Sequence, residues 1–265
     1  MKTAVITGGT RGIGAGLVRD FLLRGWNVAY SGTSDKSIEK SLLELQGKFR
    51  GVSYAAFKCD VVNEHDLNGL WEGAVNQFGR VDIWVNNAGI AYEQVPFHRI
   101  EPCVFSRIID INVKGVMMAT HIAYNRMLHQ GFGAIYNMEG LGSDGRRIFG
   151  MTPYGTSKRA VRYFTDAFAQ EVKDGPVIIG TLSPGMVLTD LLLEPLRKDP
   201  VNRKDIVRIY NILSNEPERV TPFLVRKMTG NRKNGAKISF LNSWKVIGRF
   251  LVAPFSKRDI VSKHL

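Results

Sequence analysis

The strongest constraint on the fold lies at the start of the chain, where a strand, a glycine-rich turn and a helix follow one another directly. The β-branched run Thr3–Thr7 predicts the strand, and an amphipathic helix extends to about Arg24. In this context glycines allow a tight turn and a close approach of the backbone to a ligand, and the helix N-terminus faces a pyrophosphate. The pattern favours a dinucleotide site over a plain turn, with candidate residues Gly8, Thr10, Arg11, Gly12, Ile13 and Gly14.

Strand and helix patterns then alternate along the chain. Further strands are predicted at 26–31, 52–58, 82–85, 134–138, 177–182 and 236–241, and helices at 36–48, 64–78, 101–129, 154–173 and 217–229. Such alternation predicts an α/β fold, a single Rossmann-type, doubly wound parallel sheet of about seven strands with helices on both faces, over residues 1–241. The less regular, apolar segment 190–234 is either a substrate lid or ordinary packing helices.

The end of the second strand bears on cofactor choice. An NAD-binding chain is expected to place an acid there for the ribose 2′-hydroxyl. The sequence has Ser31-Gly-Thr-Ser34 instead, with no acid before Asp35. Small hydroxyl residues, Thr33 and Ser34, together with Arg11 suit a 2′-phosphate, so the cofactor is predicted to be NADP(H).

Two later strand ends carry further candidates for the cofactor site. The third strand ends in Asp60-Val61, where the acid either contacts an adenine ring or forms a turn. The fourth is followed by Asn86-Asn-Ala-Gly89. Asn-rich turns are common, but at the carboxyl end of a central strand this one, through Asn87, Ala88 and Gly89, is suggestive of the crevice.

Length and composition indicate one large domain. The chain has 265 residues, and it contains no apolar run of about 18 residues that would span a membrane. No signal segment precedes the first strand, which predicts a location in the cytoplasm, or in an organelle interior as a mature chain. The two cysteines, Cys59 and Cys103, fit a reducing interior and suggest no metal site.

The candidate catalytic pair is Tyr154 and Lys158. Residues four apart lie on one face of a helix, so the lysine ammonium is expected near the phenol, where it would lower the tyrosine pKa. That makes Tyr154 a candidate general acid. Alone, the pair also fits a solvated helix face. Asn112, in the middle of a predicted helix, is unfavourable there, and it either bends the helix or holds water.

Taken together, the motifs closely resemble the short-chain dehydrogenase/reductase family over about residues 1–240. They are the glycine turn, Asp60, Asn86–Gly89, Asn112, Tyr154-x-x-x-Lys158, and Pro184-Gly185 through Val187 and Thr189. The resemblance implies a nicotinamide-dependent oxidoreductase in which Tyr154 is the acid/base. It also implies that Lys158 holds the ribose and tunes Tyr154, that Asn112 anchors a water, and that Pro184, Gly185, Val187 and Thr189 contact the cofactor.

One position departs from the family pattern. In that family a serine usually follows the fifth strand, three residues after an Asn, and holds the substrate oxygen. Here Asn137-Met-Glu-Gly140 places glycine at that position. Ser143, three residues on, is the replacement candidate if the loop bends. The departure leaves a second hypothesis open: a cofactor-binding scaffold or redox sensor without turnover.

Two stretches resemble more specifically the chlorophyll b reductase branch of the family. These are Tyr136–Gly145 and Thr181–Leu192, and the segment Asn211–Val220 is also similar. The resemblance implies reduction of a 7-formyl to a 7-hydroxymethyl group on chlorophyll b or chlorophyllide b, within chlorophyll catabolism. Another bulky aldehyde or ketone is the alternative substrate. The family's subunit-contact helices, near Asn112 and Tyr154, imply a homodimer or homotetramer.

The net charge of +12 is concentrated near the C-terminus. Residues 242–265 are interpreted as a basic amphipathic tail, in which Trp244, Ile247, Leu251 and Phe255 recur at helical spacing beside Lys245 and Arg249. Such a stripe either lies on an anionic membrane surface or packs against protein. No recognition motif accompanies the charge, so no nucleic-acid partner is expected.

Overall fold

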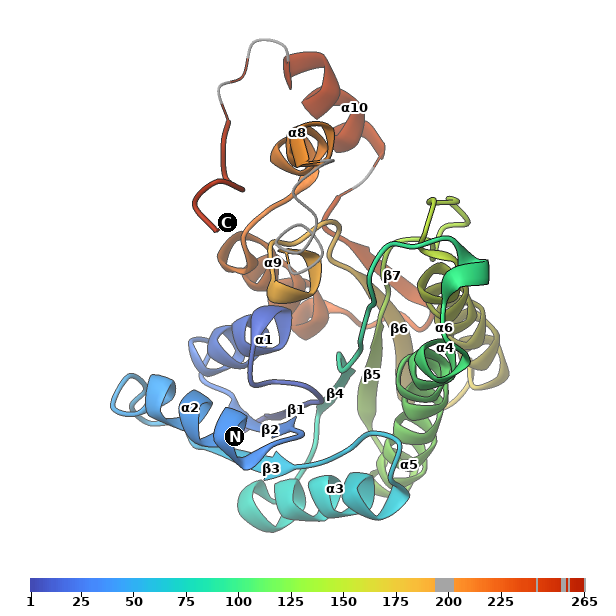
Figure 1. The fold of residues 1–265 in the computed structure, drawn as a ribbon. Helices are drawn as coiled ribbons and strands as arrows, with labels where there is room; N and C mark the ends of the chain where they lie inside the picture. Colours follow the sequence, from blue (N-terminus) through green and yellow to red (C-terminus); the bar gives the residue numbers. More distant parts are fainter. Residues whose placement is uncertain (194–202, 242, 254–255, 257, 265) are drawn as a thin grey trace.

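The computed structural model describes residues 1–193, 203–241, 243–253, 256 and 258–264 (Figure 1). Part of the expected lid, residues 194–202, lies outside this range. So does Phe255 of the predicted amphipathic stripe.

In the residues so described, seven parallel strands form one sheet in the order β3-β2-β1-β4-β5-β6-β7. The prediction of a doubly wound α/β fold is confirmed. The strand order reverses between β1 and β4, and a crevice is expected at that point, outside the carboxyl ends of the strands. The strands are β1 (Thr3–Ile6), β2 (Asn27–Gly32), β3 (Tyr54–Lys58), β4 (Ile83–Asn86), β5 (Gly133–Met138), β6 (Val177–Ser183) and β7 (Ala236–Ser239).

Helices cover both faces of the sheet (Figure 1). On one face lie α1 (Gly12–Leu22), α2 (Asp35–Leu45) and α9 (Pro217–Gly230), and on the other α3 (Glu64–Phe78), α5 (Gly115–Gln130) and α6 (Thr152–Glu171). Because successive strand residues point to opposite faces, Ala4 and Ile6 join the core beneath α1, whereas Val5 joins the one beneath α3 and α5.

The segment predicted as one helix from 101 to 129 is three joined pieces. These are α4 (Pro102–Ile109), a wider π-helical turn η2 (Asp110–Lys114), and α5. A short 3-10 turn, η1 (Phe97–Arg99), precedes α4. Asn112 lies in η2, so the predicted irregularity at this residue is present. Its side chain bonds to the backbone of Ile90, which ties the widened turn to the segment after β4.

The C-terminal region lies above the carboxyl ends of the strands in Figure 1. There α8 (Arg203–Leu213) packs against α10 (Ser243–Val252). The final segment contributes the fully buried Val261 to an apolar cluster that includes Leu188, Leu193 and residues of α8. By contrast α9, which falls within the segment expected to form a lid, packs against α1 in the main core. α9 is therefore a core helix, and the substrate lid stays a prediction for the rest of the segment.

Candidate active site

The glycine turn after β1 is shaped by close backbone contacts. Gly8 and Gly12 have φ of +65° and +56°, in the left-handed region that favours glycine. A side chain at Gly14 would collide with the carbonyl oxygen of Gly8, and one at Gly9 would lie 2.6 Å from Cβ of Tyr30. The turn therefore has to be bare backbone, which is what a pyrophosphate needs for close approach.

The N-terminus of α1 faces the same space with its first amide groups available. Its N-cap residue, Arg11, makes no side-chain hydrogen bond to the helix, and no acid stands in the first turn. Asn87 fixes the turn from β4, because its Nδ2 donates to the carbonyl oxygens of Thr7 and Gly8, at 3.0 Å each. These features fit the phosphates of a dinucleotide.

The two hydroxyl residues expected at the 2′-phosphate have different surroundings in the structure. Thr33 lines the cavity, whereas Ser34 is the N-cap of α2, where its Oγ accepts a hydrogen bond from the Ser37 amide at 3.3 Å. Arg11 is exposed beside the same end of the cavity. Ser34 is not among the residues that line it.

The first acid after β2 is occupied elsewhere. Asp35 forms an ion pair with Lys58, at 2.8 Å, and this bond holds the pKa of the carboxyl group below its ordinary value. Asp60 lines the cavity while its Oδ1 accepts the Val62 amide at 3.2 Å, so a turn and a ligand contact are compatible. Other predicted cofactor residues that line the cavity are Thr10, Ile13, Val61, Ala88, Gly89, Pro184, Gly185, Val187 and Thr189.

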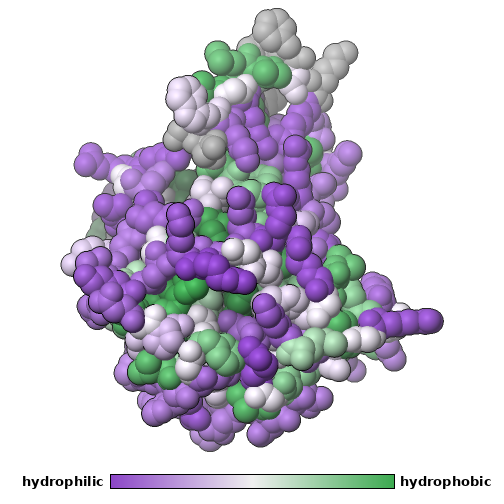
Figure 2. Space-filling model, turned by 180° about the vertical axis from the view of Figure 1, so that it is seen from behind, coloured by the Kyte–Doolittle hydropathy of each residue, from purple (hydrophilic) through white to green (hydrophobic). Residues whose placement is uncertain are grey.

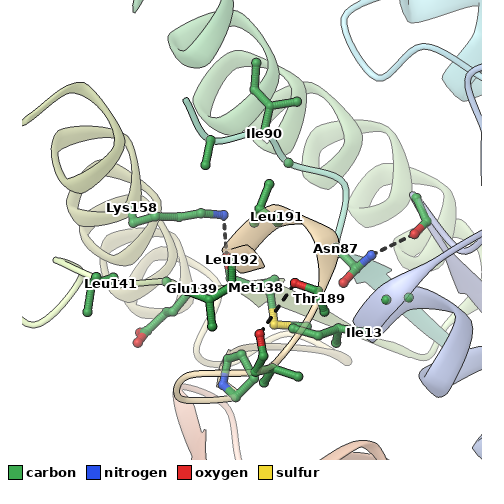
Figure 3. A pocket seen from close by; sticks show the side chains of 18 of the residues that line it. Ile13, Asn87, Ile90, Met138, Glu139, Leu141, Lys158, Thr189, Leu191 and Leu192 are labelled. Carbon is green, nitrogen blue, oxygen red and sulfur yellow. Dashed lines mark hydrogen bonds between the residues drawn. The ribbon is translucent and has the colours of Figure 1, made fainter. Parts of the chain in front are cut away.

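Tyr154 and Lys158 lie one turn apart on α6, 8% and 4% exposed. Lys158 Nζ donates to the carbonyl oxygen of Met138, at 3.2 Å, and lies 5.8 Å from the centre of the Tyr154 ring (Figure 3). Burial raises the pKa of Tyr154 to about 12 and lowers that of Lys158 to about 8. The expected lowering of the tyrosine pKa is absent from this structure, because the ammonium bonds to backbone and burial dominates.

Asn112 is completely buried and supports the site from behind. Its Oδ1 accepts the Ile90 amide at 2.8 Å, and its Nδ2 donates to the Ile90 carbonyl at 2.9 Å and to Ser157 Oγ at 3.1 Å. It is not among the residues that line the cavity. Asn112 thus joins η2, the segment after β4 and α6.

At the serine position of the family pattern, the Tyr154 hydroxyl fills the space of a side chain. A Cβ on Gly140 would lie 2.5 Å from that oxygen. Ser143 lines the cavity and is buried, and its hydroxyl donates to Glu139 Oε2 at 3.0 Å. The single hydroxyl proton of Ser143 is therefore directed to a carboxylate in this structure.

One cavity of about 950 Å³ contains the glycine turn and the Tyr154–Lys158 pair. Figure 3 shows apolar side chains in its wall, among them Ile90, Leu141, Leu191 and Leu192. A cavity of this size with a mainly apolar wall and a few polar groups is typical of small-molecule and cofactor sites.

Several residues of the site were not predicted. Val246 of α10 and His264 line the cavity, although they belong to the segment interpreted as a tail. Ser157 and Glu139 were missed as well. Glu139 did carry a signal, since it is an acid at the carboxyl end of a central strand, where ligands bind in such sheets.

The family comparison agrees with this geometry. Residues 2–199 match the model of the short chain dehydrogenase family. The chain belongs to that family. Its members are oxidoreductases, and this chain shares their fold and motif order.

Among curated proteins, this family member is similar to probable chlorophyll(ide) b reductase NYC1 of Oryza sativa subsp. japonica, 32% identical over 93% of this chain. The match covers 51% of the rice protein, so the chain spans about half the length of that relative. It is also similar to chlorophyll(ide) b reductase NOL of Arabidopsis thaliana, 35% identical over 83% of this chain and 63% of that protein.

Among solved structures, the chain is similar to 3-ketoacyl-(acyl-carrier-protein) reductase from Brucella melitensis in complex with NADH. The identity is 25%, the TM-score is 0.74, and the match covers 90% of this chain and 96% of that one. The likeness supports a nicotinamide cofactor. Within the described residues, no helix has the length and apolar character needed to cross a membrane, and no cluster of three metal-ligating side chains occurs.

Proposed function

We propose that this chain is an NADPH-dependent carbonyl reductase acting on the formyl group of chlorophyll b or chlorophyllide b. The observation that carries the proposal is that the glycine turn and the buried Tyr154–Lys158 pair open into one cavity of about 950 Å³ with apolar walls. The similarity to chlorophyll(ide) b reductases supports the substrate.

The cofactor would be held by the bare glycine turn and by the N-terminus of α1, and it supplies the hydride when bound. Choice of the phosphorylated form rests on Arg11 in the glycine turn and on Thr33 after β2. No acid is available there for a ribose hydroxyl, because Asp35 pairs with Lys58. Lys158 is assigned to the ribose and to Tyr154.

Proton delivery is assigned to Tyr154. Tyr154 lines the cavity, and its hydroxyl gives its proton to the carbonyl oxygen, which becomes the new alcohol. The phenolate left behind is stabilised by the ammonium of Lys158. Asn112 keeps Ile90 and Ser157 in place around the pair. Ser143 enters as a loop-ordering residue, because its proton is directed to Glu139.

A substrate panel with NADPH tests the proposal. Chlorophyllide b, chlorophyll b in micelles, a small water-soluble aldehyde and a bulky ketone would be compared by kcat/KM. We expect kcat/KM for the formyl tetrapyrroles to exceed that for the small aldehyde by at least about tenfold, since binding of the large body adds to transition-state stabilisation. Preference for the ketone would identify the reductase of another bulky carbonyl. Turnover of none of them would leave a cofactor-binding scaffold.

We further infer a homodimer or homotetramer formed through α5 and α6. Both helices expose apolar side chains on their outer surfaces, including Tyr163 at 76%, Met117 at 45% and Leu128 at 45%. A second copy would cover them, and Tyr163→Glu is expected to reduce the oligomer size in light scattering. Tyr163→Phe is the matched control, and equal sizes for the two variants would contradict this interface.

We also infer that α10 contacts a lipid surface. Trp244, Ile247 and Leu251 are 82%, 50% and 70% exposed, and Figure 2 shows hydrophobic residues at the end of the molecule where α10 lies. The surplus of positive charge suits an anionic membrane. Binding to anionic vesicles should fall when these three residues become Ser, and it should persist in Phe149→Ser, which removes an equally exposed ring elsewhere. The compartment, cytoplasm or organelle interior, stays a prediction.

A further inference from the structure

The carboxylate of Glu139 is buried at the reaction site with few partners. It is 5% exposed. Its Oε2 accepts the Ser143 hydroxyl at 3.0 Å and forms a long ion pair with Arg162 at 3.9 Å. Its Oε1 is buried, and no described residue donates to it. An ionised oxygen left in this state is costly, so a compensating interaction is needed to explain its presence.

Lys158 presents the complementary problem. Its ammonium is buried and, among the described residues, donates to the carbonyl oxygen of Met138, the residue directly before Glu139. The lysine stem crosses the same strand end, because a Cβ on Gly140 would lie 3.0 Å from Lys158 Cγ and 3.2 Å from Cε. The ammonium of Lys158 is thus bonded at the strand end from which the Glu139 side chain extends (Figure 3).

We propose that Glu139 is a positioning residue that acts through Lys158, its negative charge holding the buried ammonium in the protonated form. The proposal rests on the proposed function for its consequence, since Tyr154 can give up a proton only while a neighbouring cation stabilises the phenolate. Burial lowers the pKa of Lys158 to about 8, and the Glu139 charge acts in the opposite direction.

The other groups around Lys158 do not supply this charge. The segment 86–90 presents no ionisable side chain. η2 presents Asn112, while its Asp110 and Lys114 are exposed. α6 itself contributes Tyr154, which is neutral, and Arg159 and Arg162, which are positive; Arg159 donates to the carbonyl oxygen of Ser143 at 3.0 Å. In the loop after β5, Asp144 is paired with Arg146 at 2.6 Å. Among the described side chains, Glu139 alone opposes the effect of burial on the pKa.

Loss of the Glu139 charge should lower the pKa of Lys158. Below its pKa of about 8, Lys158 is charged, and loss of the Glu139 charge moves that pKa further down. The protonated fraction near pH 7.5 therefore falls, and the alkaline limb of kcat/KM moves to lower pH. A shift of about one pH unit or more is expected for the loss of an opposite charge in a buried site.

Four variants separate charge from hydrogen bonding. Glu139→Gln removes the charge and keeps an acceptor for Ser143, whereas Ser143→Ala removes the bond and keeps the charge. Glu139→Asp retains the charge. Asp144→Asn is a matched acid-to-amide control in the same loop.

The direct readout is the titration of Lys158 by NMR of lysine labelled at Cε, with the signal assigned by its loss in Lys158→Ala. Glu139→Gln should titrate at lower pH by about one unit or more, and the other three variants within about 0.3 unit of the unaltered chain. An unshifted Glu139→Gln, or an equal shift in Ser143→Ala, overturns the proposal. The titration needs no substrate, so absence of turnover with every carbonyl would reject the proposed function and leave this result to stand separately. Where turnover is found, the pH profile of kcat/KM should move with the titration.

Discussion

The cofactor end of the cavity is made by backbone, whereas the substrate end is made by side chains from distant parts of the chain. At the first end, Gly8 and Gly14 have no room for an added side chain, and the Asn87 side chain holds the turn by its carbonyl oxygens. At the second, Arg249 joins α10 to the end of α8, and the loop after β5 is held by the bond from Ser143 to Glu139. The first end is thus fixed for one ligand type, and the second is free to vary with the substrate.

The C-terminal segment illustrates how the second end is assembled. Arg249 donates to the carbonyl oxygen of Leu213 at 2.8 Å and to Asn215 at 2.7 Å, and Arg258 donates to the carbonyl oxygen of Ser214 at 2.6 Å. Cations near a helix C-terminus are favourable. Part of the basic charge in the segment interpreted as a tail therefore binds it to the end of α8.

Tyr154 lies where the two ends meet, and its loss should have the largest effect. Tyr154→Phe removes the proton donor and keeps the ring, so turnover should fall on the order of 10²–10⁴-fold. NADPH affinity should change little, since the cofactor end is untouched. Stopped-flow turnover and fluorescence titration of NADPH measure the two quantities. A parallel loss of both would contradict the separation of the two ends.

Gly14→Ala attacks the cofactor end alone. Its Cβ would meet the carbonyl oxygen of Gly8, so the turn must move and NADPH affinity should fall by about 100-fold, roughly 2.7 kcal/mol. The matched control is Gly69→Ala in α3, where no atom lies within 4 Å of the new Cβ. It should leave affinity unchanged and stabilise the helix by roughly 0.5–1 kcal/mol. Calorimetric titration measures the NADPH affinity, and thermal unfolding measures the stability. Equal NADPH affinities for Gly14→Ala and the unaltered chain would contradict close binding of the cofactor to the glycine turn.

Arg11→Ala tests the choice of cofactor within that end. NADPH should bind about tenfold more weakly, equivalent to about 1.4 kcal/mol, while NADH should bind as before. Arg24→Ala, an exposed arginine beyond the end of α1, is the control. Equal losses for NADPH and NADH would show that Arg11 does not read the 2′-phosphate.

The smallest effect on turnover is expected for Ser143→Ala. Because its proton is directed to Glu139, kcat should change by less than about threefold at pH 7. A loss near 100-fold would instead identify Ser143 as the donor to the carbonyl oxygen, as the departure at Gly140 first suggested.

The same division explains what the sequence could predict. Glycine spacing and strand order determine the cofactor end, and all predicted residues there except Ser34 line the cavity. Ser34 was predicted to contact the 2′-phosphate, but its hydroxyl caps α2 instead. Sequence spacing does not reveal whether a serine bonds to a ligand or to nearby backbone. At the substrate end, Val246 and His264 come from about 60 to 80 residues beyond the glycine of Pro184-Gly185, and only packing brings them back. Burial likewise decided the Tyr154 pKa, which helix spacing alone could not foresee.

The most direct test of the account combines both ends in one reaction with limiting chlorophyllide b. Purified chain and excess NADPH should consume one NADPH per formyl group and yield the 7-hydroxymethyl product, identified by mass spectrometry and absorbance. We expect this stoichiometry, with no product in Tyr154→Phe on the same timescale. The contradicting result is saturable NADPH binding by the same preparation with no consumption of NADPH and no alcohol formed.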